Sequence, residues 1–160
     1  MTLPAPTLQS VVGKNIKHIC GNEYVNNAHN HCAHFVAHLK GYSYGYTCKQ
    51  QTGKGTGKGA TIRVNDLFSQ CPSVGYWSAK PANVQSCLVF VTDSTNVNLQ
   101  LKRMTDHPQK HIGIFANGTI YHYSNGDDKV TSDAPTTFES KFKGRYSGRN
   151  ITMYFGTFPL

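Results

Sequence analysis

The stretch HIGIFANGTIYHYS, residues 111–124, contains the clearest local structure signal in this chain. Two runs rich in β-branched and aromatic residues flank Asn117 and Gly118, a pair that strongly favours a two-residue β-hairpin turn. Two further apolar runs, CLVFVT at residues 87–92 and NITMYFGTF at residues 150–158, predict additional strands. A hairpin with neighbouring strands indicates a mainly antiparallel sheet.

The predicted turn also sets the register of the hairpin. It pairs Ala116 with Thr119, and counting outward brings Gly113 opposite His122. Because side chains alternate along a strand, His111 should share a face with His122, diagonally across the hairpin. Gly113 has no side chain, so we expect open space between the two imidazoles.

A short helix is predicted upstream of these strands. In AHNHCAHFVAHLKG, residues 28–41, Asn30 is a favourable N-cap and Gly41 a favourable helix stop. The apolar residues between them recur at helical spacing. We therefore expect a helix over residues 31–40 with Cys32 in its first turn. A helix that precedes several antiparallel strands indicates an α+β fold.

Three other segments complete the expected fold. Residues 1–15 contain prolines and polar residues and predict an extended lead-in. Residues 62–71, IRVNDLFSQC, predict a second short helix, whereas the polar residues 93–110 predict a loop. A length of 160 residues fits one domain over residues 1–160.

Composition narrows the classes of partner. The chain has 16 basic and 8 acidic residues, a net charge of +8, which favours anionic partners. No nucleic-acid-binding motif is visible, so we expect no nucleic-acid partner. No apolar run is long enough for membrane insertion, and the N-terminus lacks the basic and apolar regions of a secretory signal. We expect a monomer.

The helix and the hairpin together offer the residues of a thiol hydrolase. A helix N-terminus stabilises a thiolate, which favours Cys32 as nucleophile. His111, at the start of a strand, is the candidate base. His122 would orient the ring of His111, although Asn125 or Asp127 could do so instead. The backbone N–H of Cys32 is the expected oxyanion donor.

The remaining cysteines and the histidines leave alternatives open. Without a CxxC motif, the other four cysteines could form two disulfides or stay as buried free thiols. His34 and His38 are one helical turn apart, as zinc ligands can be, but HFVAH lacks the glutamate of the HExxH motif. We therefore predict no metal and no cofactor. The four cysteines are Cys20, Cys48, Cys71 and Cys87.

Three segments, in the same order, resemble the NlpC-type papain-like cell-wall peptidases. NHCAHFVAHL is similar to their Asp-Cys-Ser-Gly-Phe-Val helix, VQSCLVFV to their middle strand LQPGDLVFF, and HIGIFANGTIYHYS to their HVGIYxGxGxxIHAS hairpin. The resemblance implies a papain-like fold with Cys32 as nucleophile, His111 as base and His122 as third residue. It also implies hydrolysis of amide bonds in peptidoglycan stem peptides or cross-links, without a cofactor. The chain departs from the pattern at His31 and at the Ser86-Cys87 pair.

The size, the early cysteine and the missing signal also resemble type VI secretion amidase effectors. This resemblance implies synthesis in the cytoplasm, action in the periplasm or cell wall of a target cell, and a cognate immunity protein as a partner. The expected cleft walls, which would bind the substrate, are Tyr24, His34, Tyr46 and Trp77.

Two other functions compete with peptidoglycan hydrolysis. CAHFV is similar to the Asn-Cys-Glu-His-Phe motif of lecithin retinol acyltransferase relatives, but in those permuted enzymes the base precedes the cysteine. Here the HxG segment follows it, which ranks lipid acyl transfer second. A basic binding module is the non-enzymatic alternative, because a Gly-Lys loop and nine tyrosines could hold an anionic strand.

Overall fold

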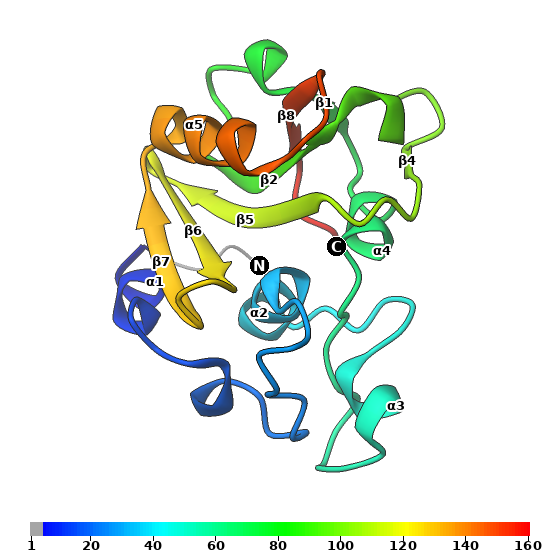
Figure 1. Ribbon diagram of the computed structural model, residues 1–160, viewed down its shortest axis with the longest axis vertical. Coiled ribbons are helices and arrows are strands. Elements are labelled where there is room, and N and C mark those ends of the chain that lie inside the picture. Colours follow the sequence, from blue (N-terminus) through cyan, green and yellow to red (C-terminus); the bar gives the residue numbers. More distant parts are fainter. Residues whose placement is uncertain (1–4) are drawn as a thin grey trace.

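The computed structural model describes residues 5–160, which form five α-helices, short 3₁₀ turns and eight strands (Figure 1). The helices are α1 (Ala5–Val11), α2 (Cys32–Lys40), α3 (Cys48–Thr52), α4 (Val64–Phe68) and α5 (Pro135–Arg145). The strands are β1 (Val74–Tyr76), β2 (Ser86–Asp93), β3 (Val97–Asn98), β4 (Arg103–Met104), β5 (Lys110–Ala116), β6 (Thr119–Ser124), β7 (Lys129–Asp133) and β8 (Ile151–Gly156).

A six-stranded sheet organises the molecule. Its strand order is β1-β8-β2-β5-β6-β7, and every neighbouring pair is antiparallel. β3 and β4 form a separate two-stranded sheet. The expected α+β class with an antiparallel sheet is confirmed. Among residues 5–160, each helix is too short or too polar to cross a membrane.

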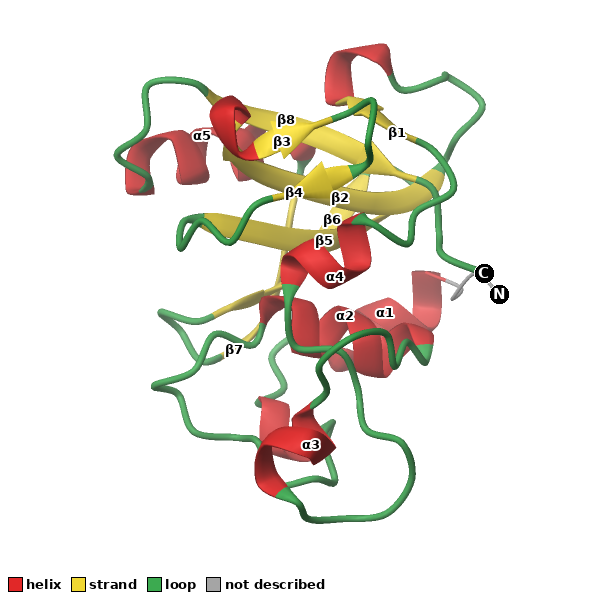
Figure 2. Ribbon diagram, turned by 90° about the vertical axis from the view of Figure 1, so that its right-hand side faces the viewer, coloured by secondary structure: helices red, strands yellow, loops and turns green. Residues whose placement is uncertain are grey.

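The sheet separates two apolar cores, because side chains alternate along its strands. On β2, Leu88 and Phe90 face the core that α1, α2 and α4 cover, whereas Val89 and Val91 face the core under α5. Figure 2 shows α1, α2 and α4 together on one side of the sheet. The helix that carries Cys32 and the helix α5 therefore approach β5 from different sides.

The hairpin has the predicted turn and register. Ala116 pairs with Thr119, and the ladder continues to Ile114 opposite Tyr121. Asn117 has a φ of 50° and Gly118 a φ of 86°. Positive φ at both central residues of a two-residue loop is the requirement of a type I′ turn, which matches the twist of the strands.

The expected open space at Gly113 is wrong. A Cβ at this position would lie 2.8 Å from Ile120 Cγ2, 3.0 Å from the Tyr121 carbonyl oxygen and 3.1 Å from His122 Cβ. The space is filled by β6 itself. A residue without a side chain is needed here because it lets β6 lie against β5 and brings the two imidazoles together.

Helix α2 begins one residue later than predicted, at Cys32. Asn30 still satisfies an orphan donor, because its Oδ1 accepts the backbone N–H of Cys32 at 2.9 Å. Gly41 ends the helix with a φ of 76°, and its N–H donates to the carbonyl of Ala37. One face of the helix packs against β5 and β6.

Several other expectations differ from the structure. The lead-in over residues 1–15 is wrong from residue 5 onward, because α1 occupies Ala5–Val11, and residues 1–4 lie outside the described residues. The helix expected over residues 62–71 is shorter and is α4. Residues 93–110 contain β3 and β4 instead of a continuous loop. β7 and α5 were not predicted, because neither has a clear apolar period.

Candidate active site

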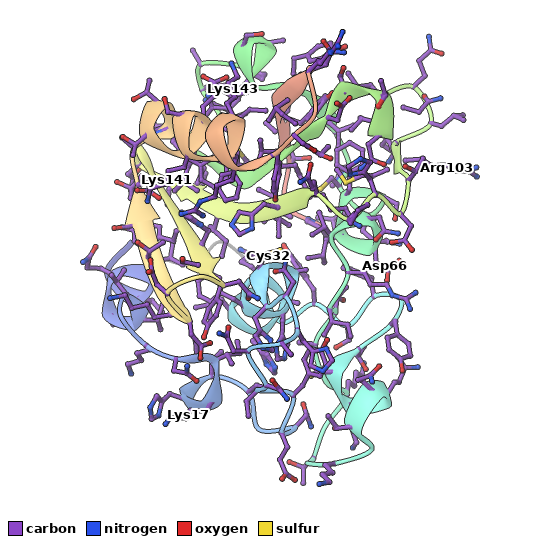
Figure 3. All side chains as sticks on the ribbon, viewed as in Figure 1. Lys17, Cys32, Asp66, Arg103, Lys141 and Lys143 are labelled. Atoms are coloured by element: carbon purple, nitrogen blue, oxygen red, sulfur yellow. The ribbon has the colours of Figure 1, made fainter. Side chains whose placement is uncertain are left out.

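Cys32 lies at the N-terminus of α2, at the end of the helix nearest β5 (Figure 3). A surface hollow opens at this point. It is bounded by the start of α2, by α4 and by the segment that enters β5. Its lining residues are Asn30, Cys32, Ile62, Arg63, Val64, Asn65, Asp106, Pro108 and Lys110.

The thiol of Cys32 is nearly enclosed, with 2% of the residue exposed. Burial raises the pKa of the Cys32 thiol to about 11, although the backbone N–H groups of Ile112 and Ala33 and the charge of Lys110 oppose that shift. At neutral pH the resting group is therefore a protonated thiol, which needs a base before it can attack.

A continuous chain of hydrogen bonds leads from α5 to His111. Lys141 Nζ donates to both carboxylate oxygens of Asp133, at 2.8 and 2.9 Å. Asp133 Oδ2 lies 2.7 Å from His122 Nε2, and His122 Nδ1 lies 2.9 Å from His111 Nε2. Asp133 is the last residue of β7, so three elements converge on the two imidazoles. Figure 3 labels Lys141, which belongs to α5.

The charge state of Asp133 fixes the tautomers along this chain. Burial alone would raise the pKa of Asp133, but the hydrogen bonds from Lys141 and His122 hold it below its ordinary value. An ionised carboxylate only accepts, so His122 carries its proton on Nε2 and accepts at Nδ1. His111 must then donate from Nε2, which leaves its Nδ1 with a free lone pair.

His111 is held as a neutral imidazole. Its ring stacks on Phe142 with 4.4 Å between the ring centroids, and Phe138 packs nearby. Burial, with the nearby His122 and Arg145, holds the pKa of His111 well below its ordinary value. No hydrogen bond within residues 5–160 engages its Nδ1. A neutral ring with a free lone pair is the form that a general base needs.

No hydrogen bond joins Cys32 to His111 in the described part of the chain: Cys32 packs in the core on the α2 side of the sheet, whereas the ring of His111 packs against Phe138 and Phe142 of α5. The backbone N–H of Ile112, the residue that follows His111 on β5, lowers the pKa of the Cys32 thiol.

The structure decides which polar group contacts His111. His122 does so directly. Asn125 accepts from the backbone N–H of His31, and Asp127 hydrogen-bonds Ser124, so neither of the alternatives reaches His111.

The backbone N–H of Cys32, the expected oxyanion donor, donates to Asn30 Oδ1 at 2.9 Å in this structure.

The four expected cleft walls do not meet around Cys32. Tyr24 packs edge-on against His34, which is fully buried on the inner face of α2. Trp77 packs against Phe115 in the core under α5. Tyr46 contacts a residue of the hollow, because Arg63 lies over its ring at 4.8 Å. For His34, helical periodicity alone could not show whether its face of α2 is buried or lines a cleft.

Sequence reasoning missed four polar residues of the hollow. Arg63 and Lys110 are cations at its edge, and Lys110 also pairs with Asp106 at 3.4 Å. Asn65 Oδ1 is buried there without a hydrogen-bond partner. Polar residues in short connecting segments were the available signal, but nothing in the sequence brings them next to Cys32.

All five cysteines are buried free thiols, which agrees with one of the two alternatives. Two of them take part in a second cluster of chemical groups, on the inner side of α2. The donor atoms of this cluster lie within 4.8 Å of one another and could hold a metal ion. Its members are Cys20, His34, His38 and Cys48.

Comparisons of this chain with protein-family models, with curated proteins and with solved structures give no match.

Proposed function

We propose that this chain is a papain-like cysteine hydrolase that cleaves amide bonds in anionic, peptide-like polymers, with peptidoglycan stem peptides or cross-links as the substrate class. The observation that carries the proposal is the hydrogen-bond chain from Lys141 through Asp133 and His122 to His111. It ends on β5 at the residue before Ile112, whose backbone N–H acts on the Cys32 thiol, and it leaves a free lone pair on the buried ring. For proton transfer the thiol would turn toward that ring, since catalytic hydrogen bonds often tighten only with substrate bound.

The reaction begins when His111 Nδ1 takes the proton of the Cys32 thiol. The thiolate attacks the substrate carbonyl carbon, and the Ile112 N–H stabilises the oxyanion. His111 then gives its proton to the leaving amine as the C–N bond breaks and a thioester forms. Water, deprotonated by His111, attacks the thioester, the C–S bond breaks and the thiol returns. His122 and Asp133 stabilise the imidazolium that forms in each half of the cycle.

The hollow supports an anionic substrate. Arg63 and Lys110 stand at its edge, and the whole chain has a net charge of +8. Stem peptides of peptidoglycan contain free carboxylates, which these cations would attract. The buried Oδ1 of Asn65 lacks a donor, and a substrate N–H would supply one.

Incubation with soluble peptidoglycan fragments, followed by mass spectrometry, tests the proposal. The unmutated chain should release new fragments, and Cys32→Ala should release none. Cys87→Ala is the matched control, because it removes another buried thiol from the far core and should keep the activity.

The alkylation rate of Cys32 separates the chemistry from the substrate. His111→Gln should slow it, because the thiol loses its base. If Cys32 is alkylated fast, and this rate depends on His111, but no fragment is cleaved, the assignment as a thiol hydrolase would stand and peptidoglycan would be rejected as its substrate. A Cys32 that reacts no faster than a model thiol, with no cleavage, would refute the enzyme and favour a binding module. Delivery into a rival cell and an immunity partner remain proposals that depend on this result.

A further inference from the structure

Four side chains that can bind a metal converge at the face of α2 that carries His34 and His38. Cys20 follows a 3₁₀ turn at Ile16–His18, His34 and His38 lie one turn apart on α2, and Cys48 begins α3. The two Sγ atoms are 3.9 Å apart. Cys48 Sγ lies 3.7 Å from His38 Nε2, which lies 3.2 Å from His34 Nε2.

These separations match the edges of a tetrahedron around one ion. With Zn–S at about 2.3 Å and Zn–N at about 2.0–2.1 Å, tetrahedral donors are about 3.8 Å apart for two sulfurs, about 3.6 Å for sulfur and nitrogen, and about 3.3 Å for two nitrogens. The three separations above differ from these values by only one or two tenths of an ångström. The other donor pairs are within 4.8 Å, so an ion would draw them together by about 1 Å at most.

A hydrogen-bond chain directs the lone pair of His34 toward this centre. The carbonyl oxygen of Asn26 can only accept, so His31 donates from Nε2 at 2.8 Å and must accept at Nδ1. His34 Nδ1, 3.0 Å from His31 Nδ1, is therefore the donor. A neutral ring protonated on Nδ1 has its lone pair on Nε2, the atom that faces the other donors. Metal-binding histidines are oriented by such a partner on the second nitrogen.

Backbone amides approach both sulfurs. The N–H of Asn22 donates to Cys20 Sγ at 3.4 Å, and the N–H of Ala60 donates to Cys48 Sγ at 3.3 Å. Such bonds favour the thiolate, the form that binds a metal. As a thiol, Cys48 donates to Asn22 Oδ1 at 3.3 Å, so metal binding would release that proton.

The cluster is buried, which favours a doubly charged ion over separate protons. Cys20, His34 and Cys48 are buried, and His38 is partly buried. Two thiolates without a cation would be costly in such a place, whereas one Zn²⁺ cancels both charges.

We propose that Cys20, His34, His38 and Cys48 bind one Zn²⁺ in a closed, structural site. Four protein ligands leave no open position for water or substrate, which distinguishes the site from a catalytic one. A tetrahedral set of two sulfurs and two nitrogens suits Zn²⁺ better than the oxygen-preferring cations. The site is separate from the hollow at Cys32 and does not depend on the hydrolase proposal.

The ion would tie together the least regular part of the molecule. Its ligands come from three segments, and Figure 1 shows that the region around α3 consists of short helices and loops away from the sheet. The same helix that binds the ion through His34 and His38 begins with Cys32. A structural ion would therefore fix the position of α2 against its surroundings.

The test is metal analysis of the full chain, purified under reducing conditions with zinc supplied and no chelator. Elemental analysis should find about one zinc per chain. After exchange with Co²⁺, the absorption spectrum should show the intense d–d bands of tetrahedral cobalt and a thiolate-to-cobalt charge-transfer band. Peptide mapping should show Cys20 and Cys48 protected from alkylation until a chelator is added.

Variants assign the ligands. Cys48→Ser and His38→Gln should each lower the zinc content or weaken zinc binding at least tenfold. Cys71→Ser is the matched control, because Cys71 is equally buried and lies outside the cluster. It should retain the full zinc content and the cobalt spectrum. If a ligand variant does not fold, the cobalt spectrum and the alkylation map of the unmutated chain still decide.

Three results would overturn the proposal. The first is a chain without stoichiometric metal whose Cys20 and Cys48 form a disulfide. The second is a metal-free chain in which both thiols alkylate without a chelator. The third is bound zinc or cobalt with no thiolate charge transfer, since the ion would then lie elsewhere.

Discussion

Gly113→Ala tests the contact that brings the two imidazoles together. The new Cβ would lie 2.8 Å from Ile120 Cγ2 and 3.0 Å from the Tyr121 carbonyl oxygen. The backbone oxygen belongs to a paired strand and cannot rotate away, so β6 must move. Overpacking of this kind costs about 1–3 kcal/mol, while the loss of glycine freedom in the unfolded chain returns about 0.4–1 kcal/mol.

The net expectation is a loss of about 1–2 kcal/mol in the free energy of unfolding, which corresponds to a fall in Tm of about 2–8 °C for a chain of this size. Urea titration and thermal denaturation measure both quantities. Gly126→Ala is the matched control, because a Cβ at Gly126 would meet nothing within 4 Å. It should change stability by less than about 0.5 kcal/mol. Equal stability of the two variants would refute the close approach of β6 at Gly113.

Three further predictions concern the network around the hairpin. Asp133→Asn keeps an acceptor for His122 but removes the charge, so the free energy of unfolding should fall by about 1–2 kcal/mol in urea titration; no change would mean that the charge stabilises nothing. Tyr123→Phe removes the hydroxyl that accepts the backbone N–H of Ile16 at 3.0 Å, and the buried orphan should cost about 1–3 kcal/mol in the same assay, whereas a neutral result would imply that water reaches that amide. His111 has a folded pKa far below its unfolded pKa of about 6.5, so its contribution to stability is complete above that pH and should fall by about 1.4 kcal/mol between pH 7.5 and pH 5.5, in addition to the contributions of the other histidines whose pKa is lowered. His111→Gln should make that fall correspondingly shallower, and equal pH slopes in the two chains would contradict a neutral, buried ring.

Local sequence signals predicted the hairpin and the helix because their determinants are local. Asn117 and Gly118 tolerate positive φ, so they fix the turn and the register whatever surrounds them. Gly41 ends α2 for the same reason. The juxtaposition of His111 and His122 followed from that register, and the structure has their nitrogens 2.9 Å apart.

The partners of these residues could not be predicted in the same way. Asp133 and Lys141 lie on β7 and α5, whose packing against the hairpin depends on a long-range antiparallel pairing. Gly113 was interpreted as open space because a sequence shows which side chain is missing but not what fills the gap. His34 could not be placed because helical spacing does not reveal which face of a helix is solvent-exposed, and Trp77 because its ring partner Phe115 is distant in the chain.

By itself, the sequence determined the α+β class, the turn at the hairpin, and the positions of Cys32 and His111 at the starts of a helix and a strand. Only the tertiary structure decided that Asp133 sets the tautomers of His122 and His111 and that two cysteines 28 residues apart meet two histidines of α2. The physical reason is range: turns and caps depend on neighbours in the chain, whereas charge relays and metal clusters depend on atoms that only packing brings within a few ångströms of one another.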